Sequence, residues 1–231
     1  MHNLGNDFIF IKEKIDCEKI KYLCNRYLGV GADGVIIVND ENKSIEIFNS
    51  DGSEANICGN ALLCLGKLYP NLDEVITKSG TKRIKRIDEH ICIEMGCPSI
   101  VKGFHKKFQG IPINIVEIGN THVIALLDDV DLFNLEYFAK SIQRFIKANV
   151  NIISDIDEES FKIRTFELGA DETSACGSGI TSSFFVLNKL GLVKEQCLAK
   201  AMLGNMEVYL ENNNIFIKST PKLVYKGVID F

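Results

Sequence analysis

The 231-residue chain lacks several features that would mark a secreted, membrane or metal-binding protein. Near its N-terminus the only apolar stretch is residues 8–11, which is far shorter than a secretory h-region, and no stretch approaches the length of a membrane span. The eight cysteines form no C-x-x-C pair and no spacing that combines with the four histidines as a zinc site. These absences favour a reduced, cytoplasmic protein without a metal.

The composition excludes two further classes of protein. Hydrophobic residues make up 46% of the chain and charged residues 25%, with no low-complexity tract, which argues against disorder. The net charge of -5 argues against a broad phosphate-binding surface, so we expect no nucleic-acid partner. One local basic run, residues 82–86, is predicted to be a solvated strand or turn.

Two short stretches of the chain are near copies of each other. Residues 54–62 (EANICGNAL) and 172–180 (ETSACGSGI) each place a glutamate four residues before a Cys-Gly pair, followed by small residues and an apolar run. At average Glu and Gly usage, a cysteine acquires both neighbours by chance about once in 150 cases. We therefore interpret Cys58 and Cys176 as a related pair and expect two domains of about 110 residues each.

Each Cys-Gly pair is predicted to lie where a loop enters a helix. A helix N-terminus offers unsatisfied N–H groups and a partial positive charge, which lower the pKa of a thiol and bind anions. Glycine after each cysteine allows close approach of a ligand to the backbone, and Ser178 adds a hydroxyl donor. Two such helix starts suit a carboxylate held between two thiols. A thiolate and a thiol on opposite sides of the adjacent α-carbon would make a two-base racemase.

The surrounding sequence predicts strands that lead into these helices. Strands are expected at 33–38, 44–48 and 160–166, and the two Cys-Gly helices should run to about Leu68 and Leu190, the second closed by Gly191. A further helix is expected over 132–148 and short strands elsewhere, at 91–94, 113–117, 123–126, 207–210 and 214–217. Many strands with few helices predict an α+β fold of curved, mostly antiparallel sheets, each around a central helix. The crossover between halves is expected near residues 103–109.

Seven segments, in order along nearly the whole chain, resemble diaminopimelate epimerase and its relatives, amino-acid racemases that work without pyridoxal phosphate. The matching segments are His2-Asn-Leu-Gly-Asn6-Asp-Phe8, residues 29–34, 48–54 and 58–60, Met95-Gly-Cys-Pro98, residues 119–122 and residues 167–179. The resemblance implies two pseudo-symmetric halves with an active site in the cleft between them. It assigns residues 1–104 to the first half and 105–219 to the second, with 220–231 returning to the first as a strand at about 223–231.

The same resemblance assigns roles to individual residues. Cys58 and Cys176 would be the acid/base pair, and the amides of Gly59, Asn60, Gly177 and Ser178 would hold the α-carboxylate. Glu167 and His122, with Asn6, would line the reacting centre, and the remaining residues expected to face the substrate are Asn49, Asn120 and Asn149. Taken one at a time, these side chains are also consistent with turn, capping or surface roles. No cofactor is implied, and homodimerisation is an inference from relatives.

Departures from the family pattern bear on the substrate. In the epimerase, the glutamate corresponding to Glu167 is followed by an arginine that binds the distal carboxylate of the substrate, whereas this chain has Leu168. An unpaired, buried distal carboxylate would cost roughly several kcal/mol. The family's Cys-Gly-Asn-Gly-x-Arg-Cys reads CGNALLC at residues 58–64, and its Gly-Asn-Pro-His reads GNTH at 119–122. These changes indicate a divergent branch. Histidine racemases belong to such a branch, so histidine is the leading predicted substrate.

Two alternatives remain open on the sequence. The chain could be an ordinary epimerase of diaminopimelate in which Arg164 replaces the missing arginine, although Arg164 should face the opposite side of its strand from Glu167. It could also be a catalytically inactive redox or ligand-binding relative, because two nearby acidic thiols can form a disulfide. The start at Met1-His2, inside the first matching segment, suggests a missing or reduced N-terminal strand.

Overall fold

The structure, a computed structural model, describes residues 1–101 and 106–229. The chain divides into two compact units, Met1–Cys92 with Thr220–Phe231, and Ile93–Ser219. The boundary predicted between residues 104 and 105 lies outside the described residues, as does part of the crossover predicted at 103–109. We call the two parts unit 1 and unit 2.

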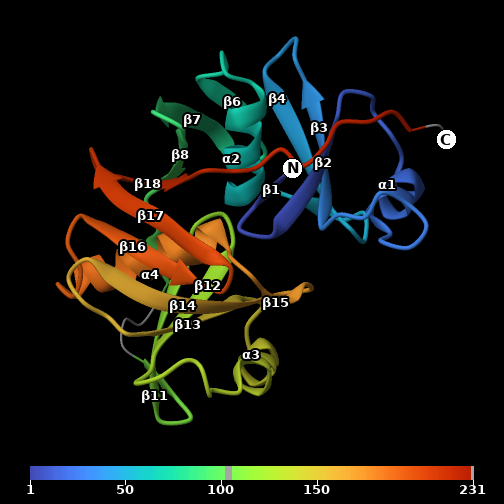
Figure 1. Cartoon of the computed structure of the whole chain (residues 1–231). Helices are drawn as coiled ribbons and strands as arrows, with labels where there is room; N and C mark the ends of the chain where they lie inside the picture. The colour runs from blue at the N-terminus through green and yellow to red at the C-terminus, as the bar shows by residue number, and fades with distance from the viewer. Residues whose placement is uncertain (102–105, 230–231) are drawn as a thin grey trace. The chain divides into compact units, whose positions relative to one another are not determined.

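Unit 1 is a mixed sheet with two helices. Its helices are α1 (Cys17–Cys24) and α2 (Gly59–Leu68). Its strands are β1 (His2–Asn3), β2 (Asn6–Ile11), β3 (Gly34–Asn39), β4 (Ser44–Asn49), β5 (Glu54–Ala55), β6 (Glu74–Thr77) and β7 (Gly80–Ile87), with β8 (His90–Gly96) crossing into unit 2. Helix α2 is buried from its first residue to Gly66, so it forms the centre of this unit (Figure 1).

Unit 2 repeats this plan with a larger sheet. Its helices are α3 (Leu135–Gln143) and α4 (Gly177–Lys189). Its strands are β9 (Ser99–Ile100), β10 (Lys106–Phe108), β11 (Ile111–Glu117), β12 (Thr121–Leu126), β13 (Asn149–Ser154), β14 (Ser160–Glu167), β15 (Asp171–Thr173), β16 (Gln196–Ala201), β17 (Gly204–Glu211) and β18 (Asn214–Ser219). Helix α4 packs against β11, β12, β13, β17 and β18 and is the buried centre of this unit.

The internal order of the two units is the same. In unit 1, α1 connects the parallel strands β2 and β3, and α2 connects the parallel strands β4 and β6. In unit 2, α3 connects the parallel strands β12 and β13, and α4 connects the parallel strands β14 and β16. Most other pairings are antiparallel, because only a crossover of helical length can return a strand parallel to its neighbour. The predicted fold class of two pseudo-symmetric α+β halves is confirmed.

Even the short strands before the two buried helices correspond. Strand β5 pairs with the end of β4 so that Glu54 lies opposite Phe48. Strand β15 pairs with the end of β14 so that Glu172 lies opposite Phe166. The repeated Glu-x-x-x-Cys-Gly pattern therefore marks a short edge strand, a tight loop and a helix start in each unit.

Two sequence predictions need correction, and one helix was missed. The helix predicted over 132–148 is shorter, because the Asn134 side chain accepts a hydrogen bond from the Tyr137 N–H at 3.0 Å and caps α3 there. Helix α1 was not predicted, although Asp16 caps it by accepting from the Lys19 N–H at 2.9 Å. The strand predicted at about 223–231 is wrong over its described part, which is irregular chain after the bridge between His2 and Lys222. Strand β1 has only two residues, so it is too short to pair with the residues that follow Lys222.

Gly66 illustrates how tightly unit 1 packs around α2. A Cβ at this position would lie 2.6 Å from Ile91 Cγ2 and 2.9 Å from Ile84 Cγ2. Alanine is a better helix former than glycine by about 1 kcal/mol, but overpacking a core costs about 1–3 kcal/mol. We expect Gly66→Ala to lower the free energy of unfolding, measured by urea denaturation. Lys67→Ala, at the next and exposed helix position, serves as the control and should change it little. A stabilised Gly66→Ala variant would contradict the packing.

Candidate active site

Cys58 and Cys176 each occupy the N-cap position of a buried helix. Cys58 precedes α2 with φ -141° and ψ 113°, and Cys176 precedes α4 with φ -117° and ψ 114°. The two backbones are therefore in nearly the same extended conformation. Cys176 is buried, with 6% of its surface exposed, and Cys58 is partly buried. The predicted positions of both thiols at helix starts are confirmed.

Neither helix start has a side-chain cap from its N-cap residue. The first helical hydrogen bonds are donated by the Leu62 N–H to Cys58 O and by the Ile180 N–H to Cys176 O. The N–H groups before them have no acceptor in the helix by its geometry, and the helix dipole adds partial positive charge there. Those N–H groups include the ones predicted to bind the α-carboxylate, on Gly59, Asn60, Gly177 and Ser178. Each helix start can therefore bind an anionic group.

In unit 1, asparagine side chains connect the helix start to the N-terminal strands. Asn60 Nδ2 donates to Asn6 Oδ1 at 3.0 Å, and Asn3 Nδ2 donates to Asn60 Oδ1 at 3.0 Å. The Cys58 thiol lies within hydrogen-bonding distance of the same Asn6 Oδ1, at 3.8 Å. Asn6 and Asn60 thus lie beside Cys58, and Asn3 is an additional buried member of the cluster.

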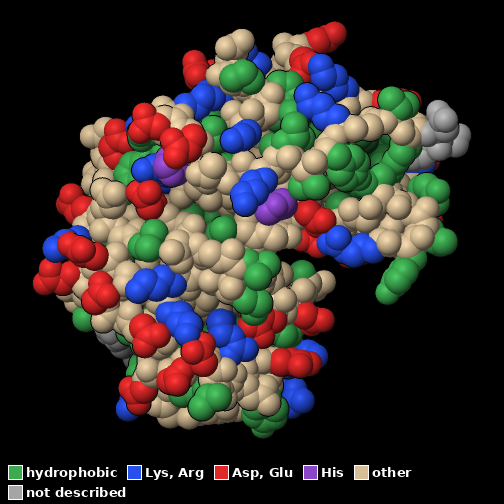
Figure 2. Space-filling view, in the orientation of Figure 1, with side chains coloured by type: hydrophobic (Ala, Val, Ile, Leu, Met, Phe, Trp, Pro, Cys, Tyr) green, Lys and Arg blue, Asp and Glu red, His purple; other side chains and the backbone are tan. Residues whose placement is uncertain are grey.

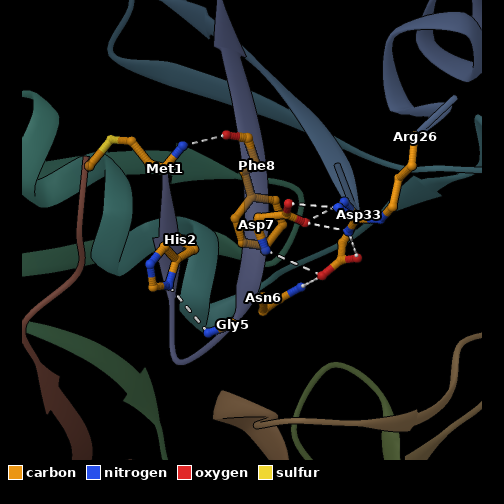
Figure 3. Close-up of polar contacts among 8 residues, drawn as sticks. All are labelled: Met1, His2, Gly5, Asn6, Asp7, Phe8, Arg26 and Asp33. Atoms are coloured by element: carbon orange, nitrogen blue, oxygen red, sulfur yellow. Dashed lines mark hydrogen bonds and ion pairs between the residues drawn. The ribbon is translucent and has the colours of Figure 1, made fainter. Parts of the chain in front are cut away.

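An ion cluster fixes the other end of Asn6 (Figure 3). Asn6 Nδ2 donates to Asp33 Oδ2 at 2.8 Å, and Arg26 Nη2 donates to Asp33 Oδ1 at 2.8 Å. Arg26 also binds both carboxylate oxygens of Asp7, at 2.8 and 3.0 Å. Because a carboxylate can only accept, the Asn6 amide must direct its oxygen towards Asn60 and Cys58.

Asn49 lies apart from this cluster. It ends β4, is exposed, and donates from Nδ2 to Ser53 Oγ at 3.0 Å within the turn that precedes β5. Asn49 therefore stabilises this turn, and its contact with a substrate stays a prediction.

In unit 2, His122 is the centre of the polar cluster. It lies on β12, is fully buried, and its Nε2 is 3.0 Å from Asn120 Oδ1 and 3.0 Å from Ser178 Oγ. Asn149 Nδ2 lies 3.5 Å from the same nitrogen. Burial lowers the pKa of His122 to about 3, so the imidazole is neutral at physiological pH. Ser178 Oγ lies 3.3 Å from Cys176 Sγ, which joins the cluster to the thiol.

Glu167 and Leu168 lie where β14 ends. Thr173 Oγ1 donates to Glu167 Oε1 at 2.7 Å, and the Leu168 N–H donates to Asn149 Oδ1 at 2.9 Å. Leu168 is 49% exposed, and Gly169 turns the chain with φ 86°. The strand end thus connects Asn149 of the polar cluster to an exposed apolar side chain.

The glutamates of the repeated pattern form ion pairs. Arg164 Nε and Nη2 bind the two carboxylate oxygens of Glu172 at 2.7 and 2.9 Å, and Glu54 pairs with Lys78. Arg164 Nη1 also donates to the backbone oxygen of Phe133 at 3.1 Å and to that of Val130. Arg164 is therefore committed to structural contacts.

The remaining buried cysteines behave as packing residues. Burial raises the pKa of Cys24 to about 11 and the pKa of Cys64 and Cys197 to about 12, so all three stay protonated. Cys92 is also fully buried. The interpretation of Cys24, Cys64 and Cys92 as small hydrophobic residues agrees with this burial.

Sequence reasoning missed several contributors to these clusters, among them Asp33, Asn151 and Thr165. Asp33 holds Asn6, while Asn151 Nδ2 lies 3.0 Å from His122 Nδ1 and Thr165 Oγ1 donates to Asn151 Oδ1 at 3.0 Å. A signal for Asn151 existed, because Asn149 and Asn151 are two residues apart in a strand and so share one face.

Residues 1–101 and 106–229 contain neither a metal-binding cluster nor a membrane-spanning helix. No group of three or more His, Cys, Asp or Glu side chains there is arranged to hold a metal ion. No helix of that part of the chain is long and apolar enough to cross a membrane. Figure 2 shows acidic and basic side chains interspersed on the visible face, without a broad basic field.

The Arg26 cluster predicts a pH dependence of stability. Burial raises the pKa of Asp7, but hydrogen bonds from Arg26 and from the Asp33 N–H outweigh it, so the pKa lies below its usual range. A carboxylate with a lowered folded-state pKa stabilises the fold above its unfolded pKa, about 4, and loses that contribution as the pH falls through its folded pKa. We expect Asp7→Asn to be less stable than wild type at pH 7, with the difference shrinking below about pH 4 in urea denaturation. The difference at pH 7 should be smaller in an Arg26→Gln background, and a pH-independent difference would contradict the assignment.

Comparison with known proteins agrees with this architecture. The sequence profile of diaminopimelate epimerase matches residues 1–101 and 114–224. Diaminopimelate epimerase of Methanococcus aeolicus is 31% identical over 284 residues, covering 98% of this chain and 96% of the relative. That of Acetivibrio thermocellus is 28% identical over 271 residues, covering 100% and 97%.

Solved structures of low sequence identity share the fold. A probable proline racemase from Agrobacterium radiobacter has a TM-score of 0.70 at 13% identity, covering 99% of this chain and 92% of its own. A hydroxyproline epimerase from Agrobacterium vitis has a TM-score of 0.68 at 13% identity, covering 96% and 87%. The chain thus belongs to the diaminopimelate epimerase family and is an isomerase of the racemase and epimerase class.

Proposed function

We propose that the chain is a cofactor-independent amino-acid racemase that uses Cys58 and Cys176 as its two bases. The observation that carries the proposal is that both thiols occupy the N-cap of a buried helix, in the same backbone conformation and without a capping hydrogen bond. A helix start carries partial positive charge and unsatisfied N–H groups, so it favours a thiolate at each N-cap cysteine.

The proposed reaction moves one proton at the α-carbon. One sulfur, as thiolate, removes the α-proton, and the other, as thiol, returns a proton to the opposite face. This requires that the α-carbon lie between the two sulfurs. The N–H groups of the two helix starts, on Gly59 and Asn60 and on Gly177 and Ser178, would bind the α-carboxylate, whose negative charge increases as the α-carbon is deprotonated. Glu167 and His122 would line the reacting centre.

The preferred substrate is histidine. Leu168 takes the place of the family's arginine, so no guanidinium follows Glu167 to bind a distal carboxylate. Arg164 is a poor substitute, because it already binds Glu172 and backbone oxygens. A neutral side chain with hydrogen-bonding nitrogens suits the asparagines predicted to face it, Asn49, Asn120 and Asn149.

The mechanism also requires that both thiols stay reduced, because a disulfide between them would stop the reaction. A cytoplasmic location meets this requirement. Homodimerisation remains a prediction from the resemblance.

Exchange of the α-proton tests the reaction directly. Reduced protein is incubated in heavy water with single L-amino acids, and loss of the Cα–H signal is followed by NMR. We expect exchange to be fastest on histidine. Cys58→Ser and Cys176→Ser should each reduce it by about 10²–10⁴-fold, the usual contribution of a general acid or base.

Cys17→Ser provides the matched control, because Cys17 is exposed and lies outside the proposed machinery. Exchange should be unchanged in that variant. If no amino acid exchanges, the protein is an inactive thiol-based redox or ligand-binding relative. Faster conversion of LL-diaminopimelate than of histidine would instead overturn the choice of substrate in favour of the epimerase.

Leu168→Arg tests the residue on which the choice of substrate depends. A charge-assisted hydrogen bond contributes about 1.5–3 kcal/mol, equivalent to about 10- to 150-fold in affinity. We therefore expect this variant to raise the ratio of kcat/KM for diaminopimelate over histidine by at least about tenfold. Leu168→Met keeps an apolar side chain of similar volume and should leave the ratio unchanged. An unaltered ratio in Leu168→Arg would show that Leu168 does not contact the substrate side chain.

A further inference from the structure

Five buried side chains of unit 2 form a continuous chain of hydrogen bonds that ends at Cys176. Thr165 Oγ1 lies 3.0 Å from Asn151 Oδ1, Asn151 Nδ2 lies 3.0 Å from His122 Nδ1, and His122 Nε2 lies 3.0 Å from Ser178 Oγ. Ser178 Oγ lies 3.3 Å from Cys176 Sγ. Each residue has less than 9% of its surface exposed, so the bonds form away from bulk water. We call this set the Thr165–Cys176 relay.

The orientation of the Asn151 amide is fixed by its neighbours. Its Nδ2 lies 3.2 Å from the backbone oxygen of Val123, which can only accept a hydrogen bond. The amino group must therefore face Val123 O, which leaves the amide oxygen to accept from Thr165. With this orientation the amino group also faces His122 Nδ1, and an amino group can only donate. His122 Nδ1 is thus an acceptor.

This arrangement determines the tautomer of His122. Because the imidazole is neutral and Nδ1 accepts, its single proton is on Nε2. Nε2–H can donate to Asn120 Oδ1 or to Ser178 Oγ, each at 3.0 Å. Asn149 Nδ2, at 3.5 Å, is the most distant of the neighbours of Nε2. When Ser178 Oγ accepts from His122, the hydroxyl proton of Ser178 is directed to the Cys176 sulfur.

We propose that Asn151 is a positioning residue that sets the tautomer of His122, so that the Ser178 hydroxyl donates to Cys176 and stabilises its thiolate. The inference rests on the proposed function, since it explains how Cys176 would be prepared to accept an α-proton. A thiolate that accepts an O–H bond is stabilised over the thiol.

Gly179 gives independent evidence that the helix start is built around Asn151. A Cβ on Gly179 would lie 2.3 Å from Asn151 Oδ1 and 3.3 Å from Thr165 Oγ1. Glycine is therefore required for α4 to approach this amide so closely. Packing of the helix start and orientation of the relay depend on the same contact.

Other titratable residues on the strands against α4 have their own partners or lie elsewhere on those strands. Glu117 accepts from Thr121 Oγ1 at 2.7 Å, and Lys218 pairs with Glu207 at 3.0 Å. The remaining titratable groups on these strands are Tyr209 and Glu211. Within the relay itself, His122 and Cys176 are the two titratable members.

The side chain beside Cys58 in unit 1 presents a hydrogen-bond acceptor, in contrast to the donor proposed for Cys176. Asn6 Nδ2 is bound to the Asp33 carboxylate, so Asn6 Oδ1 faces the sulfur at 3.8 Å and can only accept from it. An acceptor beside a sulfur favours the protonated thiol. Both cysteines occupy the same N-cap position, so the helix contribution is shared, while the described side-chain partners, Asn6 for Cys58 and Ser178 for Cys176, differ in what they can donate. The inference therefore assigns the thiolate to Cys176 and the thiol to Cys58 in the free protein.

The tautomer can be measured without substrate. In protein labelled with ¹⁵N-histidine, long-range ¹H–¹⁵N correlation spectra distinguish Nδ1–H from Nε2–H imidazoles, and His122→Gln identifies the His122 signals. We expect a neutral Nε2–H tautomer at pH 7 in wild type and an Nδ1–H tautomer in Asn151→Asp, whose carboxylate is isosteric but can only accept. An Nδ1–H tautomer in wild type would overturn the proposal.

Alkylation measures the thiolate of each cysteine. The rate of reaction with iodoacetamide is followed against pH by peptide mass spectrometry. The midpoint for Cys176 should lie below that for Cys58 and should rise by about one pH unit or more in Ser178→Ala and in Asn151→Asp. Ser183→Ala is the control, because the Ser183 hydroxyl is buried in the same helix and has no hydrogen-bond partner among the described residues.

A double variant separates the relay from a simple effect of added charge. If Asn151→Asp acts through Ser178, it should add little to the midpoint shift in a Ser178→Ala background, whereas direct repulsion would add fully. Folding of every variant is checked by circular dichroism and thermal unfolding. Additive shifts, or an unchanged Cys176 midpoint in folded variants, would overturn the inference. Neither measurement requires turnover, so a failure of the racemase proposal in the exchange assay is recognised separately.

Discussion

The start of each central helix is the constraint on which the rest of the structure depends. Helices α2 and α4 are buried in their units, yet each begins at a cysteine that supplies no capping hydrogen bond. Replacing a good N-cap residue usually costs about 1 kcal/mol, and a buried helix end needs partners for its first N–H groups. The missing cap hydrogen bond therefore lowers the stability of the fold at both helix starts. Binding of an anion at the helix starts would offset that loss.

The fold positions these helix starts by a repeated order of elements. In each unit a helical crossover joins two parallel strands, an antiparallel strand follows, and a short edge strand leads through a tight loop into the buried helix. The glutamate in each copy belongs to that edge strand and forms an ion pair. The glutamate therefore anchors the strand before the loop through its ion pair. The cysteine four residues later is the N-cap residue of the helix.

The two units differ in the polar groups that surround the equivalent cysteines. In unit 1 a carboxylate turns the Asn6 amide so that its oxygen faces Cys58. In unit 2 a backbone oxygen turns the Asn151 amide so that its amino group faces His122. In both cases an oxygen that can only accept a hydrogen bond sets the orientation of an amide. That orientation decides whether the amide presents its oxygen or its amino group to the next side chain. Equivalent backbones thus carry different hydrogen-bond polarity, which suits a pair in which one sulfur accepts a proton while the other donates one.

The sequence by itself determined the duplication, the strand-loop-helix order around both cysteines and the family, because these depend on local patterns and on spacing along the chain. It also marked His122, Asn149 and Ser178 individually. Only the tertiary structure brought Thr165 and Asn151 to His122, and Asp33 to Asn6, since these residues lie in or next to strands whose register is set by long-range pairing. The tertiary structure also decided that residues 223–229 form no strand, because pairing with the two-residue strand β1 is limited to the bridge between His2 and Lys222. Hydrogen-bond direction follows from which groups face each other in space, and no pattern along a single chain specifies that.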